Sequence, residues 1–322
     1  MRLISTIPDT IGSLTNLVHL YLDGNKLRGT LPPTIGSLVN LNTLLMAYNS
    51  LSGPIPYTIG SMTSLQTLFI FGNKLNGTLP DTIGSLTNLI SLDLSHNKIG
   101  GTLPFTIGSL SNLQVMEMQN NLFTGAIPDT IGSMTSMTHI DFNNNKLSGT
   151  LPSAIGSVTK LTRLYLNSNK LRGTLPPTIG SLVNLNILSM TSNSLSGPIP
   201  YTIGSMTSLQ TLFIVGNKLN GTLPNTIGSL TNLVTLHLYN NKIGGTIPTT
   251  FSQLVRLSSL ALQFNYLTMG TALTVPTSTF SPLTLSYLGG SSGVRGARAL
   301  ANNCLAFSYG TTSVTATRCL IS

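Results

Sequence analysis

Residues 73–96 read NKLNGTLPDTIGSLTNLISLDLSH, and a segment of this kind recurs along most of the chain. An asparagine, here called the ladder asparagine, stands at position 25 and at every 24th residue up to position 265, eleven times in all. The residues eight, five and three places before each ladder asparagine are always Leu, Ile, Met or Phe. Glycine four places after it and proline seven places after it occur in ten of the eleven copies. Repetition with a fixed period predicts a solenoid, a stack of similar coils that share one core.

Each part of the repeat predicts one part of a coil. The alternation of apolar residues before the ladder asparagine, as in Leu20-x-Leu22, is typical of a short strand with alternate side chains buried. The asparagine ends that strand, and its amide can bond to buried backbone in neighbouring coils. The glycine and the proline favour a tight turn and an extended outer segment, and TIGSLxN allows a turn or two of 3₁₀ or α-helix. We therefore expect an α/β solenoid with 24-residue coils, a parallel β-sheet on its concave side and short 3₁₀ or helical turns on its convex side.

The composition excludes two other classes of protein. Of the 322 residues, 41% are hydrophobic and only 7% are charged, with 16 Lys and Arg against 7 Asp and Glu and a net charge of +9. So large an apolar fraction excludes charge-driven disorder. No run of 18 or more apolar residues occurs in the sequence, so no transmembrane segment is predicted. Asn, Thr, Ser and Gly at fixed places in the repeat supply most of the polar groups.

The segment LxGTLPxTIGSLxNL is similar to the plant-type leucine-rich repeat of receptor-kinase ectodomains and polygalacturonase-inhibiting proteins. It also resembles the leucine-rich surface antigens of kinetoplastid protists, which share the GTLP-type segment. The resemblance covers roughly residues 3–270 and implies a leucine-rich repeat solenoid that acts outside the cell or on its surface. The sequence departs from the plant members because no kinase domain follows the repeats and the paired-cysteine N-terminal cap is missing. The resemblance therefore does not imply kinase signalling.

The two ends of the chain differ from the repeats. We expect a solenoid of about eleven repeats over residues 1–270 and a C-terminal capping or flanking segment over residues 271–322. Met1 stands where a ladder asparagine would, and MRLISTIPDT has neither a cap nor the apolar segment of a secretory signal. A bare hydrophobic end favours aggregation, so we expect a natural beginning with cap and signal upstream of Met1. A cytosolic chain that is capped by a partner is the alternative.

The two cysteines of the sequence, Cys304 and Cys319, lie in the C-terminal segment. A disulfide between them would cap the solenoid and indicate an oxidising compartment, whereas two free thiols would suit an intracellular chain. A metal site is not expected, because neither a CxxC motif nor a nearby histidine accompanies them. Asn76 and Asn220 stand in N-G-T sequons, which suit extracellular N-glycosylation, although the repeat itself also generates this triplet.

Residues 26–104 and 170–248 are near-copies of each other, with twelve differences in 79 positions. Nine of the differences fall six, four, two or one place before a ladder asparagine, where we expect side chains on the concave face. Exposed convex positions barely changed, so the pattern indicates selection or recombination for variable recognition; drift of an exposed surface is the alternative. The nine pairs are Thr43/Ile187, Leu45/Ser189, Ala47/Thr191, Tyr48/Ser192, Phe71/Val215, Ser91/Thr235, Asp93/His237, Ser95/Tyr239 and His96/Asn240.

One column of the concave face combines acidic and aromatic side chains. Four places before five successive ladder asparagines stand Phe69, Asp93, Glu117, Asp141 and Tyr165. Neighbouring parallel strands lie about 4.8 Å apart, so the three acids stack and repel one another. A bound cation would relieve the repulsion, either a protein or peptide that bears Lys or Arg or a Ca²⁺ ion; pairing with His139 or Arg163, or plain solvation, is the alternative. The residues predicted to bind the ligand are Tyr21, Tyr48, Phe69, Asp93, Glu117, Asp141, Arg163, Tyr165, Phe213, His237 and Tyr239.

Basic residues gather on another side of the repeat. The residue after the ladder asparagine is lysine in seven coils, and two of these coils carry an arginine two places further on: Lys26, Lys74, Lys98, Lys146, Lys170, Lys218, Lys242, Arg28 and Arg172. This lateral edge suits an anionic glycan or a membrane surface. Nucleic acid is not expected, because the edge lacks interleaved aromatic residues for base stacking. A solvated edge that aids solubility is the alternative.

The sequence gives catalysis little support. Asp93, Ser95 and His96 are close together, but a strand places no histidine where it could activate the serine. Asp93 and Glu117 lack the cleft that a glycosidase needs, and neither a cofactor nor a catalytic metal is expected. We predict a non-catalytic extracellular or cell-surface recognition protein that binds protein or peptide ligands on its concave face. The alternatives are a structural or antigenic surface coat and, by resemblance alone, a secreted inhibitor of a wall-degrading enzyme.

Overall fold

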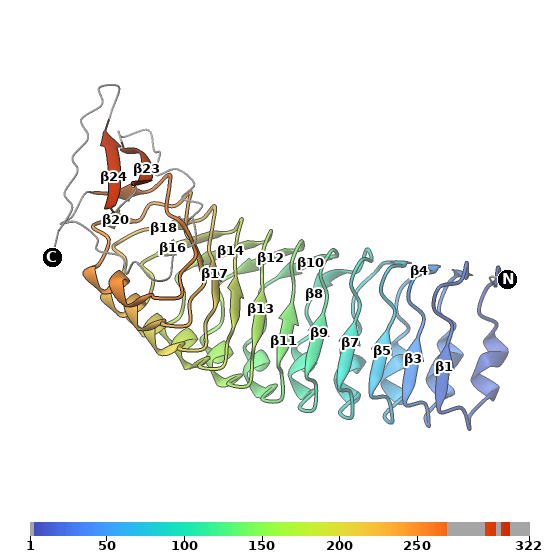
Figure 1. The fold of residues 1–322 in the computed structure, drawn as a ribbon. Helices are drawn as coiled ribbons and strands as arrows, with labels where there is room; N and C mark the ends of the chain where they lie inside the picture. Colours follow the sequence, from blue (N-terminus) through green and yellow to red (C-terminus); the bar gives the residue numbers. More distant parts are fainter. Residues whose placement is uncertain (1–2, 269–293, 301–303, 310–322) are drawn as a thin grey trace. The chain divides into compact units, whose positions relative to one another are not determined.

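The computed structural model describes residues 3–268, 294–300 and 304–309. The chain divides into two compact units, residues 1–170 and 171–322, and each unit is described by itself. Both contain the same type of coil (Figure 1), in which a short lateral strand, a five-residue 3₁₀ helix and a three-residue strand follow one another. The predicted 24-residue coils with parallel strands and 3₁₀ turns are therefore confirmed.

The main sheet of the first unit is formed by the strands that precede the ladder asparagines. These strands pair in parallel and in chain order, and from the second strand onward the middle residue of each is buried. The apolar alternation of the repeat thus places one side chain per strand in the core and two on the outer face of the sheet. The strands are β1 (His19–Tyr21), β3 (Thr43–Leu45), β5 (Thr67–Phe69), β7 (Ser91–Asp93), β9 (Val115–Glu117), β11 (His139–Asp141) and β13 (Arg163–Tyr165).

Lateral strands and 3₁₀ helices complete the coils of the first unit. The lateral strands are β2 (Arg28–Gly29), β4 (Ser50–Gly53), β6 (Lys74–Leu75), β8 (Gly100–Thr102), β10 (Leu122–Gly125) and β12 (Lys146–Gly149). The 3₁₀ helices are η1 (Asp9–Ser13), η2 (Pro33–Ser37), η3 (Tyr57–Ser61), η4 (Asp81–Ser85), η5 (Phe105–Ser109), η6 (Asp129–Ser133) and η7 (Ser153–Ser157). Each helix follows a proline with extended backbone, as at Pro80 with φ −70° and ψ 146°, so the proline fixes the direction in which the chain enters the turn.

The second unit repeats the arrangement. Its main strands are β15 (Ile187–Ser189), β17 (Thr211–Phe213), β19 (Thr235–His237) and β21 (Ser259–Ala261). Its lateral strands are β14 (Lys170–Gly173), which begins at the last residue of the first unit, β16 (Ser194–Gly197), β18 (Lys218–Leu219), β20 (Gly244–Gly245) and β22 (Tyr266–Leu267). Its 3₁₀ helices are η8 (Pro177–Ser181), η9 (Tyr201–Ser205), η10 (Asn225–Ser229) and η11 (Thr249–Gln253). Farther along the chain, β23 (Val294–Leu300) and β24 (Cys304–Tyr309) pair antiparallel.

The ladder asparagines join neighbouring coils, as the repeat predicted. The Asn73 side chain accepts the backbone N–H of Leu51 at 2.9 Å. Its Nδ2 donates to the carbonyl of Met46 in the preceding coil at 2.9 Å and to Ile70 in its own coil at 3.1 Å. One amide thus satisfies backbone groups of two turns that are shielded from water, which explains why no other residue replaces asparagine at this place.

The glycine of the TIGS segment allows the 3₁₀ helices to stack closely. A Cβ on Gly84 would lie 2.4 Å from the carbonyl oxygen of Thr106 in the next coil, so no larger residue fits without a backbone shift. Thr106 in turn donates its hydroxyl to the carbonyl of Asp81 at 2.6 Å. The convex positions that barely differ between the two near-copies are therefore constrained by packing between coils.

The outer positions of the repeat divide into two kinds. Only the residues six and four places before the ladder asparagine lie on the strand, because each main strand ends at the latter. The residue directly before the asparagine adopts a left-handed backbone, as at Tyr48 with φ 52° and His96 with φ 54°. We expected all four positions on the concave face, but the residues two and one places before the asparagine lie beyond the strand, because the chain has already turned before it reaches the asparagine.

Several predictions concern residues outside the described part of the chain. Cys319 lies there, and the side chain of Cys304 is likewise not described, so their disulfide stays a prediction. The boundary near residue 270 between the solenoid and a C-terminal segment also stays a prediction. Among the described residues, no helix has the length and apolar character that a membrane crossing requires.

Candidate functional site

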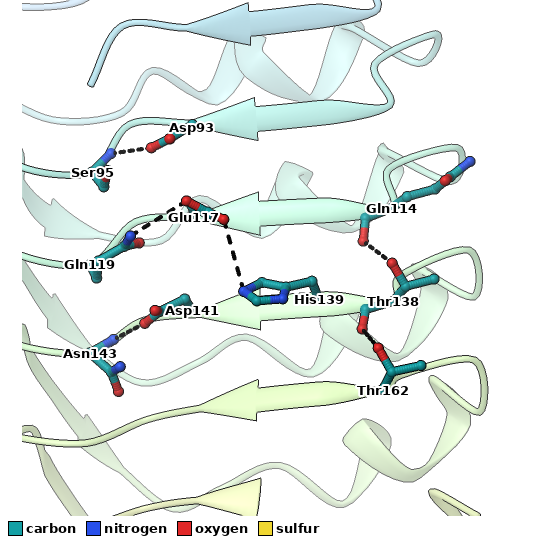
Figure 2. A network of polar contacts seen from close by, with 10 residues as sticks. All are labelled: Asp93, Ser95, Gln114, Glu117, Gln119, Thr138, His139, Asp141, Asn143 and Thr162. Atoms are coloured by element: carbon teal, nitrogen blue, oxygen red, sulfur yellow. Dashed lines mark hydrogen bonds and ion pairs between the residues drawn. The ribbon is translucent and has the colours of Figure 1, made fainter. Parts of the chain in front are cut away.

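The three predicted acids lie side by side on the main sheet of the first unit. Asp93 on β7 pairs in register with Glu117 on β9, and Glu117 pairs with Asp141 on β11. Figure 2 shows the three carboxylates one above another along the sheet. Phe69 on β5 stands opposite Asp93 and Tyr165 on β13 stands opposite Asp141, so an aromatic ring closes the column at each end. The 24-residue period alone fixes this register, and the predicted stacking is confirmed.

Asp93 is largely buried, with 9% of its surface exposed. Its Oδ1 accepts the backbone N–H of Ser95 at 2.9 Å (Figure 2). Burial raises the pKa of Asp93 to about 6, the charge of Glu117 adds to the rise, and the hydrogen bonds from Ser95 oppose it. Its carboxylate is therefore ionised at neutral pH but close to its titration range.

Asp141 repeats this geometry two coils farther on. Its Oδ1 accepts the backbone N–H of Asn143 at 2.9 Å (Figure 2). Burial again raises the pKa to about 6, the hydrogen bond from Asn143 opposes the rise, and the charges of Glu117 and Asp93 add to it. The two outer carboxylates of the column thus share one conformation and one titration range.

Glu117 lies between them and has two polar neighbours. Nε2 of His139 is 3.9 Å from Oε1 of Glu117, and the amide of Gln119 donates to Oε2 at 3.5 Å (Figure 2). Burial lowers the pKa of His139, the charge of Glu117 opposes that change and the charge of Arg163 reinforces it. His139 is therefore mainly neutral at pH 7, and its contact compensates little of the negative charge of Glu117.

Arg163 does not neutralise the acids. It stands opposite His139 in the sheet, its side chain is exposed, and it has no carboxylate within ion-pair distance in the described part of the chain. The predicted intramolecular pairing is thus limited to the long contact of His139. A Ca²⁺ site is not supported either, because the described residues contain no group of three or more His, Cys, Asp or Glu side chains arranged to hold a metal ion.

The predicted aromatic residues form separate clusters. In the first unit Tyr48 contacts Phe71 edge-on with centroids 4.9 Å apart, and Phe69 approaches Phe71 at 6.3 Å. Tyr48 is 67% exposed, so this ring is available to a partner. Tyr165 lies 5.6 Å from the ring of His139, beside the acids.

Tyr21 lies at the other end of the same sheet, on β1. It is 60% exposed and stacks on His19 with centroids 5.9 Å apart. Two strands, β3 and β5, lie between β1 and β7, and Phe69 on β5 stands between Tyr21 and Asp93, so Tyr21 does not belong to the acidic column.

The predicted residues of the second unit form a cluster without acids. Phe213 stacks on His237 with centroids 4.8 Å apart, and Tyr239 lies 6.3 Å from the same imidazole. Nε2 of His237 is 2.8 Å from the hydroxyl of Ser259, and burial lowers the pKa of the histidine. This aromatic cluster and the acidic column are distinct candidate sites on different units.

Sequence reasoning missed the polar residues that surround the carboxylates. Gln119 is the most informative, because its Oε1 is buried without a hydrogen-bond partner in the described part of the chain. Asn120 bonds to His96 at 3.2 Å and accepts the side chain of Asn144 at 3.0 Å, which makes a polar row beside the column. The asparagines directly before two successive ladder asparagines were the available signal for this row.

A chain of hydroxyl contacts borders the other end of these strands. Thr138 donates its hydroxyl to the carbonyl of Gln114 at 3.0 Å, and Thr162 donates to the carbonyl of Thr138 at 2.8 Å (Figure 2). The hydroxyl contacts thereby join the beginnings of β9, β11 and β13, in addition to the backbone hydrogen bonds between these strands.

The predicted glycosylation sites lie away from the main sheet. Asn76 and Asn220 follow β6 and β18 by one residue, and both side chains are exposed. N-glycosylation of the two sequons stays a prediction.

Family models described as "Leucine rich repeat" match almost every coil. The longer model matches residues 87–147, 111–171, 159–219 and 207–267, and a shorter one matches residues 16–38, 40–62 and 64–86. Among curated proteins, none is similar enough to count as a relative.

Solved structures resemble the chain over most of its length. A plant peptide hormone receptor, RGFR1, in complex with RGF2 is 37% identical with a TM-score of 0.81; the match covers 83% of this chain and 43% of that one. The ectodomain of the Arabidopsis receptor kinase HAESA in complex with an IDA peptide hormone is 32% identical with a TM-score of 0.78, covering 83% and 44%. The Leptospira interrogans protein LIC12759 is 33% identical with a TM-score of 0.68, covering 84% and 65%. The match thus spans less than half the length of these two plant receptor chains.

Proposed function

The chain belongs to the leucine-rich repeat family, and we propose that it is a non-catalytic recognition protein whose first unit binds a peptide or protein segment on its main sheet. The ligand carries a Lys or Arg side chain next to an aromatic or apolar one. The observation that carries this proposal is the stack of three carboxylates on β7, β9 and β11, which has more acceptor oxygens than neighbouring donors.

The acceptors outnumber the donors around this column. Asp93 and Asp141 each accept a backbone N–H with one carboxylate oxygen, and Asp93 also interacts with the side chains of Ser95 and Glu117. Glu117 has in addition a distant, mainly neutral histidine and one long amide contact. A guanidinium group carries five N–H donors and an ammonium group three, so either fits a site composed of acceptors.

Aromatic rings give the site its apolar contribution. Phe69 and Tyr165 flank the acids along the column, and Tyr48 and Phe71 extend the apolar surface beyond Phe69. Tyr and Arg are among the side chains that most often contribute large binding energies in protein interfaces. An extended segment lying across the strands could therefore place a cationic side chain on the acids and an apolar one on Phe69 or Tyr165.

The similar structures support recognition of peptides. RGFR1 and HAESA are described as complexes with peptide hormones, and another HAESA structure, 30% identical, contains the co-receptor SERK1 as well. The same likeness supports an extracellular or cell-surface location for this chain. The identity of the ligand follows from the column of acids in this sequence and not from those receptors.

Non-catalytic action fits the surroundings of the candidate residues. Ser95 is 2% exposed and its neighbour Asp93 bonds to its backbone, so the hydroxyl is not presented to a substrate. His96 bonds to Asn120 on the side of the turn. Ser95 and His96 are therefore not arranged as a nucleophile and its base.

Selection of random peptides displayed on phage tests the proposal. The net charge of +9 favours acidic peptides by simple attraction, so enrichment of Arg or Lys beside an aromatic residue would have to come from a local site. We expect that enrichment with the natural chain and its loss with the Asp93→Asn, Glu117→Gln, Asp141→Asn variant. Enrichment of acidic peptides, or the same basic peptides from both chains, would overturn the proposal.

A further inference from the structure

A row of exposed basic side chains runs along the lateral strands of the first unit. The residue after the ladder asparagine is an exposed lysine in five of its coils, and an exposed arginine follows the first of them: Lys26, Lys74, Lys98, Lys146, Lys170 and Arg28. We call these six side chains the lateral row. Arg28, Lys74, Lys146 and Lys170 are the first residues of β2, β6, β12 and β14, and Lys26 and Lys98 stand two places before β2 and β8.

Backbone pairing fixes the spacing of the lateral row. Ser52 of β4 stands opposite Lys74 of β6, and Lys98 donates its backbone N–H to the carbonyl of Leu75 at 2.7 Å. Thr124 of β10 stands opposite Lys146 of β12. The pairing is staggered by two residues, so each lysine stands opposite the residue three places after the preceding ladder asparagine. Lysines of adjacent coils, such as Lys74 and Lys98, are therefore diagonal neighbours on the lateral side.

Buried and exposed side chains alternate along each lateral strand, and the lysine side chains are on the exposed side. Leu75 and Leu147, the residues that follow Lys74 and Lys146, are buried with 0% and 1% of their surface exposed. The lysine that precedes each of them must therefore project into solvent. The row is thus built into the fold by the same alternation that fills the core.

The lateral row has no counter-charge of its own. None of the lateral segments contains Asp or Glu, from residues 26–29 in the first coil to residues 146–149 in the sixth. Within the described residues the recorded ion pair is that of His139 with Glu117, so no lysine of the row has an acidic partner within 4.0 Å. Neighbouring cations such as Lys74 and Lys98 repel each other, and a polyanion that lies along the row would relieve this repulsion.

Polar side chains accompany the cations. Thr124 and Asn76 are exposed on the same lateral strands or next to them, and Ser50, Ser52 and Ser148 are half-buried there. Hydroxyl and amide groups can bond to the hydroxyl groups of a sugar, whereas the lysines meet its sulfate or carboxylate groups. Aromatic residues for base stacking are missing from this face, because Phe123, the aromatic residue of these segments, is 1% exposed.

We propose that the lateral row of the first unit binds a linear sulfated or carboxylated polysaccharide. The ligand lies across the coils, along the direction in which the lysines recur. This site differs in charge, in its strands and in its ligand from the acidic column of the main sheet. The two proposed sites are therefore independent, and each can be tested without the other.

Binding to heparin, used as the probe polysaccharide, tests the proposal. The informative variant is Lys74→Gln with Lys98→Gln, which removes two adjacent cations of the row. The matched control is Lys160→Gln with Arg256→Gln, which removes the same charge at two exposed places fifteen residues after a ladder asparagine. All four side chains are exposed, so the variants should fold normally.

We expect the natural chain to bind heparin at 0.15 M salt, the row variant to bind at least ~10-fold more weakly and the control to stay within about twofold. Substituting Asp93, Glu117 and Asp141 should leave heparin binding intact. Equal weakening of the row variant and the control would overturn the proposal. Equally tight binding of duplex DNA or of anionic lipid vesicles would also overturn it, because the row would then attract any polyanion.

Discussion

The carboxylate of Asp93 folds back onto the backbone of its own turn, where Oδ1 accepts the N–H of Ser95 at 2.9 Å. Asp141 makes the same contact with Asn143 two coils farther on. Each aspartate is thereby held in one orientation. Asp93 is largely buried and Asp141 is half-buried, and the second carboxylate oxygen of each does not take part in this bond. Two consequences follow, one for stability and one for binding.

Stability should fall as pH rises through the titration range of these aspartates. Burial raises the pKa of Asp93 and Asp141 from 3.8 to about 6. A raised pKa means that the folded state binds more protons than the unfolded state, so the contribution is fully present below about pH 4 and is lost above pH 6. We expect Asp93→Asn with Asp141→Asn to raise the free energy of unfolding at pH 7.5 by on the order of 1–3 kcal/mol in total, after allowance for partial exposure.

Urea unfolding at pH 4 and at pH 7.5 checks this prediction. Asp81→Asn on the exposed start of η4 is the control, and it should change the free energy of unfolding by less than about 0.5 kcal/mol at either pH. A double variant that is less stable than the natural chain at pH 7.5 would contradict the expectation.

Peptide binding should depend on pH in the opposite sense. A cationic side chain favours the ionised aspartates, so binding lowers their pKa and becomes stronger as pH rises from 5 to 7.5. We expect an affinity gain of roughly tenfold over this range for an Arg-containing peptide, because two groups titrate with a pKa of about 6. Fluorescence anisotropy at the two pH values measures it, and an affinity that does not change would show that the aspartates do not contact the cation.

Removal of a ladder asparagine should be costly. Asn97 accepts the backbone N–H of Leu75 at 3.0 Å and donates to the carbonyl of Ile70 at 3.0 Å, and both contacts are buried. Asn97→Ala leaves these groups without partners, and we expect a loss of about 2–4 kcal/mol in the free energy of unfolding. Asn76→Ala, at an exposed asparagine, should cost less than about 0.5 kcal/mol. Thermal unfolding followed by circular dichroism compares the two, and equal losses would contradict the ladder account.

A methyl group in the 3₁₀ turns should separate neighbouring coils. In Gly84→Ala the new Cβ meets the carbonyl oxygen of Thr106 at 2.4 Å, and we expect a loss of at least about 2 kcal/mol. The control is Gly100→Ala, where the nearest atom is 3.4 Å away, which should cost about 1 kcal/mol or less. Chemical unfolding of both variants measures these losses in the free energy of unfolding. A Gly84→Ala chain as stable as the control would contradict the packing argument.

The fold was predictable because each recurring feature of the 24-residue repeat favours the same coil structure. Apolar residues at fixed places, the ladder asparagine and the TIGS segment each favour the same coil, and a 24-residue period also fixes which residues are neighbours on the sheet. The alignment of Asp93 with Glu117 and of Glu117 with Asp141 therefore followed from counting alone.

The chemistry of the site was less predictable, because it depends on how side chains turn after the strand ends. Counting did not reveal the left-handed backbone at Tyr48 or the exposure of its ring. It also did not reveal that Asp93 bonds to its own turn or that Arg163 leaves the acids unpaired. Burial of a strand position depends on the size of its neighbours, so the raised pKa of the aspartates required three-dimensional coordinates.

The affinity of a single peptide for three forms of the chain tests the central claim most directly. The peptide is acetyl-Tyr-Arg-Tyr-Arg-Tyr-amide, measured by calorimetry at pH 7.5 with the natural chain, with the Asp93→Asn, Glu117→Gln, Asp141→Asn variant, and with Asp9→Asn, Asp81→Asn, Asp129→Asn. Both variants remove three negative charges from the first unit, but the last set lies on the 3₁₀ helices η1, η4 and η6. We predict binding at least ~10-fold weaker for the first variant and within about twofold of the natural chain for the second. Equal affinity for all three forms, or equal weakening of both variants, would contradict a binding site on the acidic column.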